Sequence, residues 1–176
     1  MLSILKLIVD SIATILGGVL LLRFWMQAIR VRPPSSVAQF TFQLSDWLVR
    51  PMRRIVPGVG GYDWASLIGA FLIVLLATSV LFVAGWTAQA VLLVALQRFL
   101  QWILYGFMAL LVVEAIFSWI NPHAPLAPFV RALNEPLLRP LRRVVPLVGN
   151  LDLSLLVALI LLQIANILLG MAFSGR

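Results

Sequence analysis

The sequence contains no cysteine and only one histidine, and these two scarcities remove several kinds of site. Without cysteine the chain cannot form a disulfide framework, a thiolate metal site or a cysteine nucleophile. His123 alone cannot build a multi-histidine metal site. A phosphate-binding glycine loop, a zinc signature and a nucleophile–base constellation are also missing from the sequence. We therefore expect no metal, no cofactor and no enzymatic activity.

Charged residues are scarce as well. Only 11% of the 176 residues are charged and 62% are hydrophobic, and the mean hydropathy is +1.08. Soluble domains are typically about 45–50% apolar and about 25% charged. A domain of this size lacks the interior volume to bury so many apolar side chains, so they need a lipid solvent. The composition therefore predicts an integral membrane protein.

Four apolar stretches have the length of a membrane-spanning helix. Such a helix crosses about 30 Å of hydrocarbon with roughly 20 residues. The four stretches are 3–22, 64–82, 99–120 and 151–173. A shorter apolar run, 88–96, either extends the third helix or lies in the membrane interface. The expected fold is therefore an all-α membrane protein with four transmembrane helices.

The basic residues gather in the two long connections between these spans. Residues 23–63 and 121–152 together hold ten of the thirteen basic residues. With four spans both connections lie on the same face of the membrane, and the positive-inside rule makes that face cytoplasmic. Both termini are then periplasmic. The net charge of +7 therefore indicates attraction to anionic lipid headgroups, and we expect no nucleic-acid partner.

Each connection also carries apolar residues at helical spacing. They predict a short amphipathic helix in the headgroup layer on the cytoplasmic side. In the first connection they are Val37, Phe40, Leu44, Trp47 and Leu48, and in the second Leu126, Phe129, Val130, Leu133 and Leu137. Prolines lack the backbone N–H that a helix needs, so they are expected to end both helices. These prolines are Pro51, Pro57, Pro136, Pro140 and Pro146.

A motif after each amphipathic helix is repeated. Residues 50–63 read RPMRRIVPGVGGYD and residues 139–152 read RPLRRVVPLVGNLD, with nine identities in fourteen positions. We interpret the chain as two tandem hairpins, 1–86 and 99–176, joined by a linker at 87–98. Each hairpin crosses the membrane twice, so the two copies have the same orientation. Transporters built on inverted repeats need copies of opposite orientation, and the pattern weakens that interpretation.

The residues of this repeated motif, which we name the Arg-Pro hinge, suggest specific roles. Its arginines are expected to bind anionic headgroups or a partner: Arg50, Arg53, Arg54, Arg139, Arg142 and Arg143. Its prolines and glycines shape the turn before the next span: Pro51, Pro57, Gly60, Pro140, Pro146 and Gly149. Asp63 and Asp152 stand where a helix N-cap belongs. An ion pair between arginine and aspartate across the hinge is also possible.

Four polar residues are expected within or at the ends of the spans. They are Arg23, Glu114, Gln163 and Asn166. Charge is costly in the membrane and is often functional there. We expect Arg23 to neutralise Glu114 and hold the two hairpins together, with a proton or cation relay as the alternative. Gln163 and Asn166 are expected to join helices by hydrogen bonds, with a pore lining as the alternative.

The same residues resemble the YggT family (YggT/YlmG membrane proteins), in its two-repeat proteobacterial form. In the first half the resemblance lies in Arg23-Phe24-Trp25-Met26-Gln27 and in residues 50–63. In the second half it lies in Phe117-Ser118-Trp119-Ile120, Glu135-Pro136-Leu137-Leu138 and Arg142-Arg143 with 149–154. The resemblance implies an inner-membrane protein without catalytic residues. Relatives are associated with tolerance of osmotic and ionic stress, and with assembly roles in plastids. Glu114 departs from the pattern, because the family usually carries arginine before Ser-Trp.

We expect a non-enzymatic adaptor, assembly or stress-tolerance factor of the bacterial inner membrane, bound to anionic lipid through the Arg-Pro hinges. A homo-oligomer or a membrane-protein partner is compatible with this interpretation. The alternative is a small oligomeric channel or transporter for ions or osmolytes. In that case Arg23, Glu114, Gln163 and Asn166 would line the path.

Overall fold

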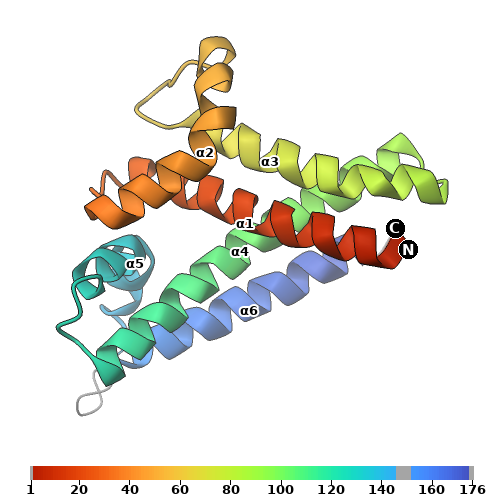
Figure 1. The fold of residues 1–176 in the computed structure, drawn as a ribbon. Helices are drawn as coiled ribbons and strands as arrows, with labels where there is room; N and C mark the ends of the chain where they lie inside the picture. The colour runs from red at the N-terminus through yellow and green to blue at the C-terminus, as the bar shows by residue number, and fades with distance from the viewer. Residues whose placement is uncertain (1, 146–151, 175–176) are drawn as a thin grey trace.

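The computed structural model describes residues 2–145 and 152–174, and their regular structure is helical throughout. The helices in chain order are α1 (Leu2–Ala28), α2 (Ser35–Ile55), α3 (Trp64–Thr78), the 3-10 helix η1 (Ser79–Ala84), α4 (Ala88–Ile120), α5 (Ala127–Leu141) and α6 (Leu153–Ser174). Figure 1 shows both termini at one end of the long helices, with α2 and α5 toward the other end. We name that second region the α2/α5 end.

Among the described residues, four segments are long and apolar enough to cross a membrane, as the sequence predicts. They are Lys6–Ala28, Trp64–Ala84, Ala88–Ile120 and Leu153–Phe173. The second comprises α3 and η1, because the helix tightens after Thr78. The hydroxyls of Thr78 and Ser79 bond back to the carbonyls of Val74 and Leu76. Such bonds compete with the regular helix pattern and account for the change.

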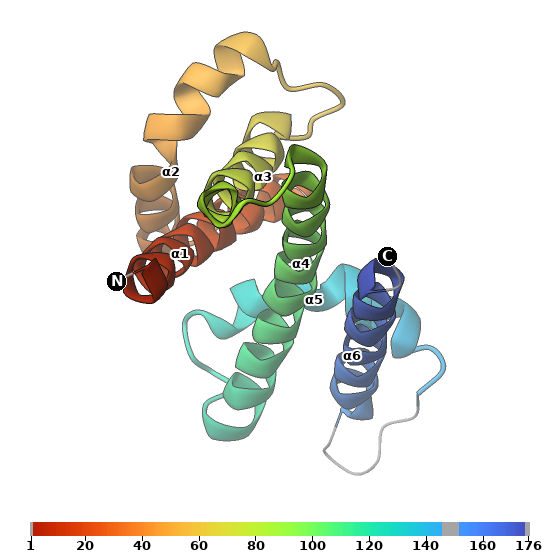
Figure 2. The same ribbon diagram turned by 90° about the vertical axis from the view of Figure 1, so that its right-hand side faces the viewer.

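Helix α4 is longer than expected. Residues 88–98, taken from the sequence mostly as a linker, form its first turns. Thr87 starts the helix as its N-cap, with its hydroxyl accepting from the Ala90 N–H. The 33 residues of α4 rise about 50 Å, more than the hydrocarbon thickness of about 30 Å. In Figure 2, α4 lies between α1, α2 and α3 on one side and α6 on the other, and it contacts α1, α3, α5 and α6.

Two apolar clusters hold these helices together. The first joins α1, α2 and α3 mainly through small residues: Ala13, Leu20, Val49, Ala65, Ala70, Ile73 and Ala77. The second joins α4, α5 and α6 through Leu111, Leu138, Leu155 and Ala158. Small side chains let helix backbones approach closely, which drives helix association where lipid removes the hydrophobic driving force.

The expectation that Pro51, Pro136 and Pro140 end the amphipathic helices is wrong. Helix α2 continues through Pro51 to Ile55, and α5 continues through Pro136 and Pro140 to Leu141. A proline removes one helix hydrogen bond, and the helix can bend instead of ending. The ribbon of α2 bends before its last turns (Figure 1). Fully buried Val49 and Leu138 hold the helices in place near these prolines.

The two amphipathic helices, α2 and α5, differ in which side they turn toward the rest of the protein. Helix α2 turns Thr41, Ser45 and Val49 toward the protein, whereas Phe40 and Trp47 are exposed. The protein-facing side is polar because it must accommodate a buried arginine of α1, described below. Part of the apolar side of α2 is therefore exposed, while Leu48 packs against the first apolar cluster. In α5, by contrast, stripe residues Val130 and Leu133 are buried.

Gly17 and Gly18 give a test of the contact between α1 and α4. A methyl group on Gly17 would overlap the indole ring of Trp102, whereas one on Gly18 would meet nothing within 4 Å. We expect Gly17→Ala to destabilise the protein by about 1–3 kcal/mol through overpacking. The matched change Gly18→Ala should stabilise by up to about 1 kcal/mol through helix propensity. Thermal unfolding in detergent measures both, and equal shifts would contradict the close approach.

Candidate functional site

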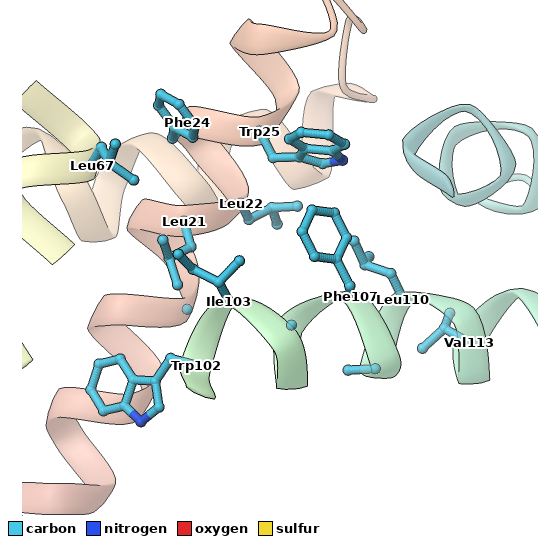
Figure 3. Close-up of a pocket in the computed structure, with 13 residues that line it drawn as sticks. Leu21, Leu22, Phe24, Trp25, Leu67, Trp102, Ile103, Phe107, Leu110 and Val113 are labelled. Carbon is cyan, nitrogen blue, oxygen red and sulfur yellow. The ribbon is translucent and has the colours of Figure 1, made fainter. Parts of the chain in front are cut away.

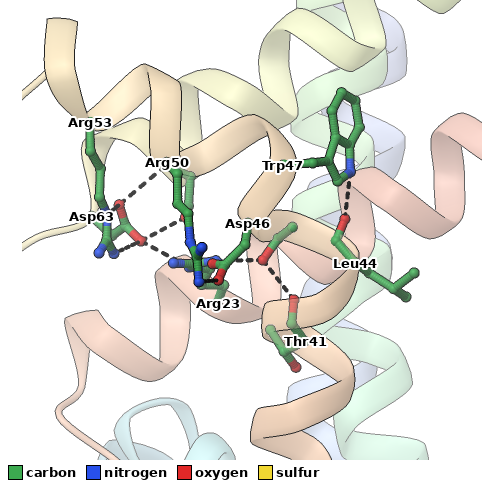
Figure 4. Close-up of polar contacts among 10 residues, drawn as sticks. Arg23, Thr41, Leu44, Asp46, Trp47, Arg50, Arg53 and Asp63 are labelled. Atoms are coloured by element: carbon green, nitrogen blue, oxygen red, sulfur yellow. Dashed lines mark hydrogen bonds and ion pairs between the residues drawn. The ribbon is translucent and has the colours of Figure 1, made fainter.

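Arg23 is the centre of a buried polar cluster in the first half of the chain. Its side chain lies on α1 and is only 6% exposed. Arg23 Nη1 donates to Ser45 Oγ at 2.6 Å and to Asp46 Oδ1 at 2.7 Å, both on α2. Its Nε lies 3.3 Å from Asp63 Oδ2, just before α3. Figure 4 shows Arg23 between Asp46 and Asp63, so one guanidinium group connects α1, α2 and the start of α3.

Asp63 is both the N-cap of α3 and the acceptor of an ion pair across the first hinge. Arg53 Nη2 lies 2.7 Å from Asp63 Oδ2, and Arg53 Nε donates to Oδ1 at 3.3 Å. The hydroxyl and backbone N–H of Ser66 donate to the same carboxylate at 2.7 and 3.4 Å. This two-pronged guanidinium–carboxylate geometry fixes orientation as well as charge. The hinge is therefore locked to the first turn of α3.

Arg142 is the centre of a second cluster. Its Nε donates to Asp152 Oδ2 at 2.8 Å, across the second hinge. Its Nη1 donates to Glu135 Oε2 at 3.0 Å, and its Nη2 to Glu114 Oε1 at 3.3 Å. Asp152 precedes α6 and accepts from the Ser154 backbone N–H at 3.0 Å. One guanidinium therefore holds three carboxylates from α4, α5 and the start of α6.

Glu114 does not pair with Arg23, which corrects the expectation from the sequence. The side chain of Glu114 is 5% exposed, and its carboxylate accepts from Asn134 Nδ2 at 2.8 Å as well as from Arg142. Both partners belong to the second half of the chain, as the partners of Arg23 belong to the first. Each buried charge is thus neutralised within its own half, by Asp46 on α2 and by Arg142 just after α5.

The two clusters share aligned positions in the hinges and in α2 and α5, but the buried charge on the preceding span has the opposite sign. The shift of 89 residues that aligns the hinges places Arg53 and Asp63 on Arg142 and Asp152. It also places Ser45-Asp46 on Asn134-Glu135, the residues of α2 and α5 that enter the clusters. The buried charge on the preceding span differs, arginine on α1 and glutamate on α4, and the same shift places Arg23 on Val112, two residues before Glu114. Both clusters centre on a guanidinium group, but in the second a single one, Arg142, is shared by three carboxylates.

The six hinge arginines divide into two kinds. Arg53 and Arg142, the first of each Arg-Arg pair, bind the aspartate ten residues later. Arg54 and Arg143, the second of each pair, are exposed. Arg139 is exposed too, and Arg50 is 79% exposed while touching Asp46 at 2.8 Å. Within the described residues, Arg54, Arg139 and Arg143 form no salt bridge.

The turn of the first hinge follows the expected backbone pattern. Pro57 lies between α2 and α3, and Gly60 and Gly61 have φ of 69° and 82°. Positive φ is strained for residues with a Cβ, so glycine suits both positions. In the second hinge Pro146 and Gly149 lie outside the described residues.

The carboxylates outside the spans are held in their charged form. The hydrogen bond from Arg23 is the main reason that the pKa of Asp46 lies below its usual range. Burial alone would raise the pKa of Asp63, but hydrogen bonds from Arg53 and Ser66 outweigh it and lower that pKa. Burial would also raise the pKa of Asp152. Hydrogen bonds from Arg142 and Ser154 outweigh this effect, so the pKa of Asp152 is lowered. All three groups are therefore ionised at neutral pH.

These lowered pKa values predict acid sensitivity. A carboxyl whose pKa is lower in the folded state adds stability above its unfolded pKa, near 3.8, and loses it as the pH falls through the folded pKa. We expect the Tm in detergent to be steady from neutral pH to about 5 and to fall below about 4. Asp63→Asn should lower the Tm at pH 7 and flatten this acid slope. An unchanged slope in the variant would contradict the assignment.

The four polar residues of the spans do not come together. Arg23 and Glu114 belong to separate clusters, and Asn166 Nδ2 on α6 donates to the Tyr105 hydroxyl on α4 at 3.3 Å. Gln163 is exposed on α6. Among the described residues no group of three histidine or acidic side chains is placed to hold a metal ion. The structure therefore offers polar joints between helices at separate points.

Three hydrogen bonds between helices were not predicted from the sequence. Asn134 links Glu114 to α5, and Ser45 links Arg23 to α2. Trp25 joins the two halves, because its Nε1 donates to the Leu133 carbonyl at 2.9 Å. The first two contacts could have been suspected from the sequence. The shift of 89 residues aligns Ser45-Asp46 with Asn134-Glu135, so a polar residue followed by an acidic one occurs at the same place in both halves. No pattern in the sequence indicates the joint made by Trp25.

A cavity of about 350 Å³ opens between α1 and α4 beside Trp25. Figure 3 shows Trp25 and Phe107 facing each other at its wall, and their rings meet edge to face with centroids 4.8 Å apart. The remaining lining is apolar, with Gly18 and Gly106 leaving room. This cavity suits hydrocarbon and presents no charged side chain.

Comparison with known proteins identifies the family. The model of the CCB3/YggT family matches residues 1–84 and 93–173. The protein "Uncharacterized protein in proC 3'region" of Vibrio alginolyticus is 34% identical, covering 86% of this chain and 85% of its own. "Uncharacterized protein YggT" of Escherichia coli K12 is 30% identical, covering 92% and 87%. An "Uncharacterized protein" of Haemophilus influenzae is 31% identical, covering 94% and 91%.

No solved structure matches the chain. The family match extends over both halves and agrees with the resemblance read from the hinges. The four span-length helices fit an integral membrane protein of this family. The chain belongs to the CCB3/YggT family.

Proposed function

We propose that the protein is a non-enzymatic adaptor or assembly factor of the bacterial inner membrane that binds anionic lipid headgroups at its α2/α5 end. In this proposal the α2/α5 end is cytoplasmic and both termini are periplasmic. The cellular role is support of osmotic and ionic stress tolerance. The observation that carries the proposal is the outward position of Arg54, Arg139 and Arg143 at the ends of two interfacial helices.

The division of labour within each arginine pair supports this proposal. Arg53 and Arg142 form the ion pairs that connect each hinge to the aspartate before the next helix. These ion pairs fix the backbone beside Arg54 and Arg143, so the outward guanidinium groups are presented from a rigid position. Each basic residue near an anionic membrane surface contributes roughly 1 kcal/mol of attraction. Three to four such groups bound together are enough to enrich anionic lipid around the protein.

The exposed apolar face of α2 supports it as well. Phe40 and Trp47 are more than half exposed and point away from the protein. An amphipathic helix of this kind buries its apolar face at the boundary between headgroups and acyl chains. Tryptophan also favours that boundary. With α2 at this depth, the arginines at its end lie at the level of the lipid phosphates.

The lipid assignment is tested by counting lipids that remain bound in native mass spectrometry. The purified full chain is compared with the triple variant Arg54→Gln, Arg139→Gln, Arg143→Gln after exposure to phosphatidylglycerol or phosphatidylcholine. We expect the wild type to retain more phosphatidylglycerol and the variant to lose that excess. Equal retention of the two lipids by the wild type, or unchanged retention in the variant, would remove the proposal. We expect the variant to fold, because none of these three side chains forms a salt bridge within the described residues.

The rival proposal, a small channel or transporter for ions or osmolytes, has less support. Arg23 and Glu114 are almost fully buried in separate clusters, each held by side chains of its own half. A conducting path through them would need those ion pairs to open. Gln163 on α6 is the one member of the set that faces outward, and this position fits a hydrogen bond to a second membrane helix. Reconstituted protein that passes ions would favour the rival.

A further inference from the structure

From a second pocket, at the terminal end of the helices, we infer that the protein binds a phosphate-bearing anion through Lys6 and Arg98. The pocket has a volume of about 250 Å³ and lies among α1, α3, η1 and α4. Its polar lining comprises Lys6, Thr78, Gln97, Arg98 and Gln101. Pockets for drug-sized ligands usually hold about 300–1,000 Å³. This pocket therefore suits a small anionic group.

The convergence of two cations is the first argument. Only three basic residues lie outside the two Arg-rich connections: Lys6, Arg98 and Arg176. Two of them line this one pocket, although they come from α1 and α4. Like charges at one place disfavour each other's charged form, and an opposite charge nearby favours it. Two cations at one pocket therefore favour negative charge beside them.

Asp10 supplies only part of that negative charge. Its Oδ1 lies 3.0 Å from Arg98 Nη2. Lys6 forms no salt bridge with a described carboxylate. One positive charge at the pocket is therefore left for a ligand. The three donors of the ammonium group and the carboxamides of Gln97 and Gln101 match the several acceptor oxygens of a phosphate.

The depth of Arg98 is the second argument. It lies 22 residues before the last residue of α4, Ile120, which corresponds to about 33 Å along the helix. The hydrocarbon core is about 30 Å thick. If the end of α4 near Ile120 lies at one membrane surface, Arg98 therefore lies at the other. Lipid phosphates are concentrated at that level, and a free phosphate ion could enter from the water beside it.

A structural role for the two cations is the competing explanation, since the pocket adjoins the end of α3. Positive charge near a helix C-terminus is favourable on its own. However, backbone carbonyl groups at that helix end already accept hydrogen bonds. The Ser79 N–H donates to the Leu75 carbonyl, and the Thr78 hydroxyl donates to Val74. If the two cations only stabilised this helix end, the protein would not bind an added anion at the pocket. The titration below distinguishes these two explanations.

The test uses a fluorophore on a single cysteine at Val83, because the chain has no cysteine of its own and Val83 is an exposed residue of η1 near the pocket. The full-length protein in neutral detergent is titrated with short-chain phosphatidylglycerol, short-chain phosphatidylcholine or inorganic phosphate. Lys6→Gln removes one charge, worth roughly 1 kcal/mol, and should weaken phosphatidylglycerol binding about fivefold. Asp10→Asn should strengthen it, because Arg98 is freed. Arg32→Gln removes the same charge from an exposed arginine between α1 and α2 and should leave the midpoint unchanged.

A saturable response to phosphatidylglycerol that inorganic phosphate does not reproduce assigns the site to a lipid headgroup. A response to both assigns it to phosphate itself. Either result supports the inference when the Lys6→Gln shift accompanies it. An unchanged midpoint in Lys6→Gln, or an equal response to phosphatidylcholine, overturns it. Because Arg54 and Lys6 lie at opposite ends of the helices, failure here leaves the proposed lipid site at the α2/α5 end untouched.

Discussion

Arg142→Gln is expected to lower the free energy of unfolding by about 3 kcal/mol. This lies at the low end of the range of about 3–5 kcal/mol for breaking a buried ion pair, because the side chain of Arg142 is 30% exposed. The change leaves three carboxylates, Glu114, Glu135 and Asp152, without their shared guanidinium. Of these Glu114 is the most buried and carries most of the penalty. Unfolding by sodium dodecyl sulfate in mixed micelles, followed by circular dichroism, measures the loss.

Arg143→Gln is the matched control. It removes the same charge one residue later, from an exposed side chain, and should change stability by less than about 0.5 kcal/mol. The double variant Arg142→Gln, Glu114→Gln should recover part of the loss, because the buried carboxylate no longer needs a counter-charge. Equal effects of Arg142→Gln and Arg143→Gln would show that Arg142 is not the centre of this cluster.

The secondary structure could be predicted from the sequence because it depends on hydropathy and spacing. Four apolar stretches of the right length gave four helices, and the apolar spacing in the two connections indicated the positions of α2 and α5. Asp63 before an apolar run pointed to an N-cap, where the structure places it. Each of these features is set by residues within a few turns of one another, so a local pattern carries the information.

The ion pairs could not be predicted in the same way. Glu114 had Arg23 and four arginines of the second connection as candidate partners, and nothing in their spacing favours Arg142. Which arginine of a pair turns inward depends on how the end of α5 is rotated about its axis. Helix α5 also continues through Pro136 and Pro140 to Leu141, where the sequence pattern predicted helix ends. The choice between Arg142 and Arg143 is therefore a result of tertiary packing.

Arg23→Gln is expected to have the largest effect, a loss of about 3–5 kcal/mol in the free energy of unfolding. The side chain is almost fully buried and bridges Asp46 and Asp63, so its removal leaves two carboxylates facing each other on α2 and before α3. Ser45 also loses the donor that reaches its hydroxyl oxygen. Arg50 and Arg53 still contact the two aspartates, which limits the loss to this range. The same mixed-micelle titration measures it.

Glu114→Gln, the change at the buried charge of α4, is expected to cost much less. The glutamine keeps the size of the side chain and can still accept from Asn134 through its carbonyl oxygen. It also removes one of three carboxylates that share Arg142, so the remaining charges are better balanced. The two buried span charges thus differ because Arg23 bridges two carboxylates, whereas Glu114 is one of three carboxylates that share a single guanidinium. A loss at Glu114→Gln as large as at Arg23→Gln would contradict this account of the charge inversion.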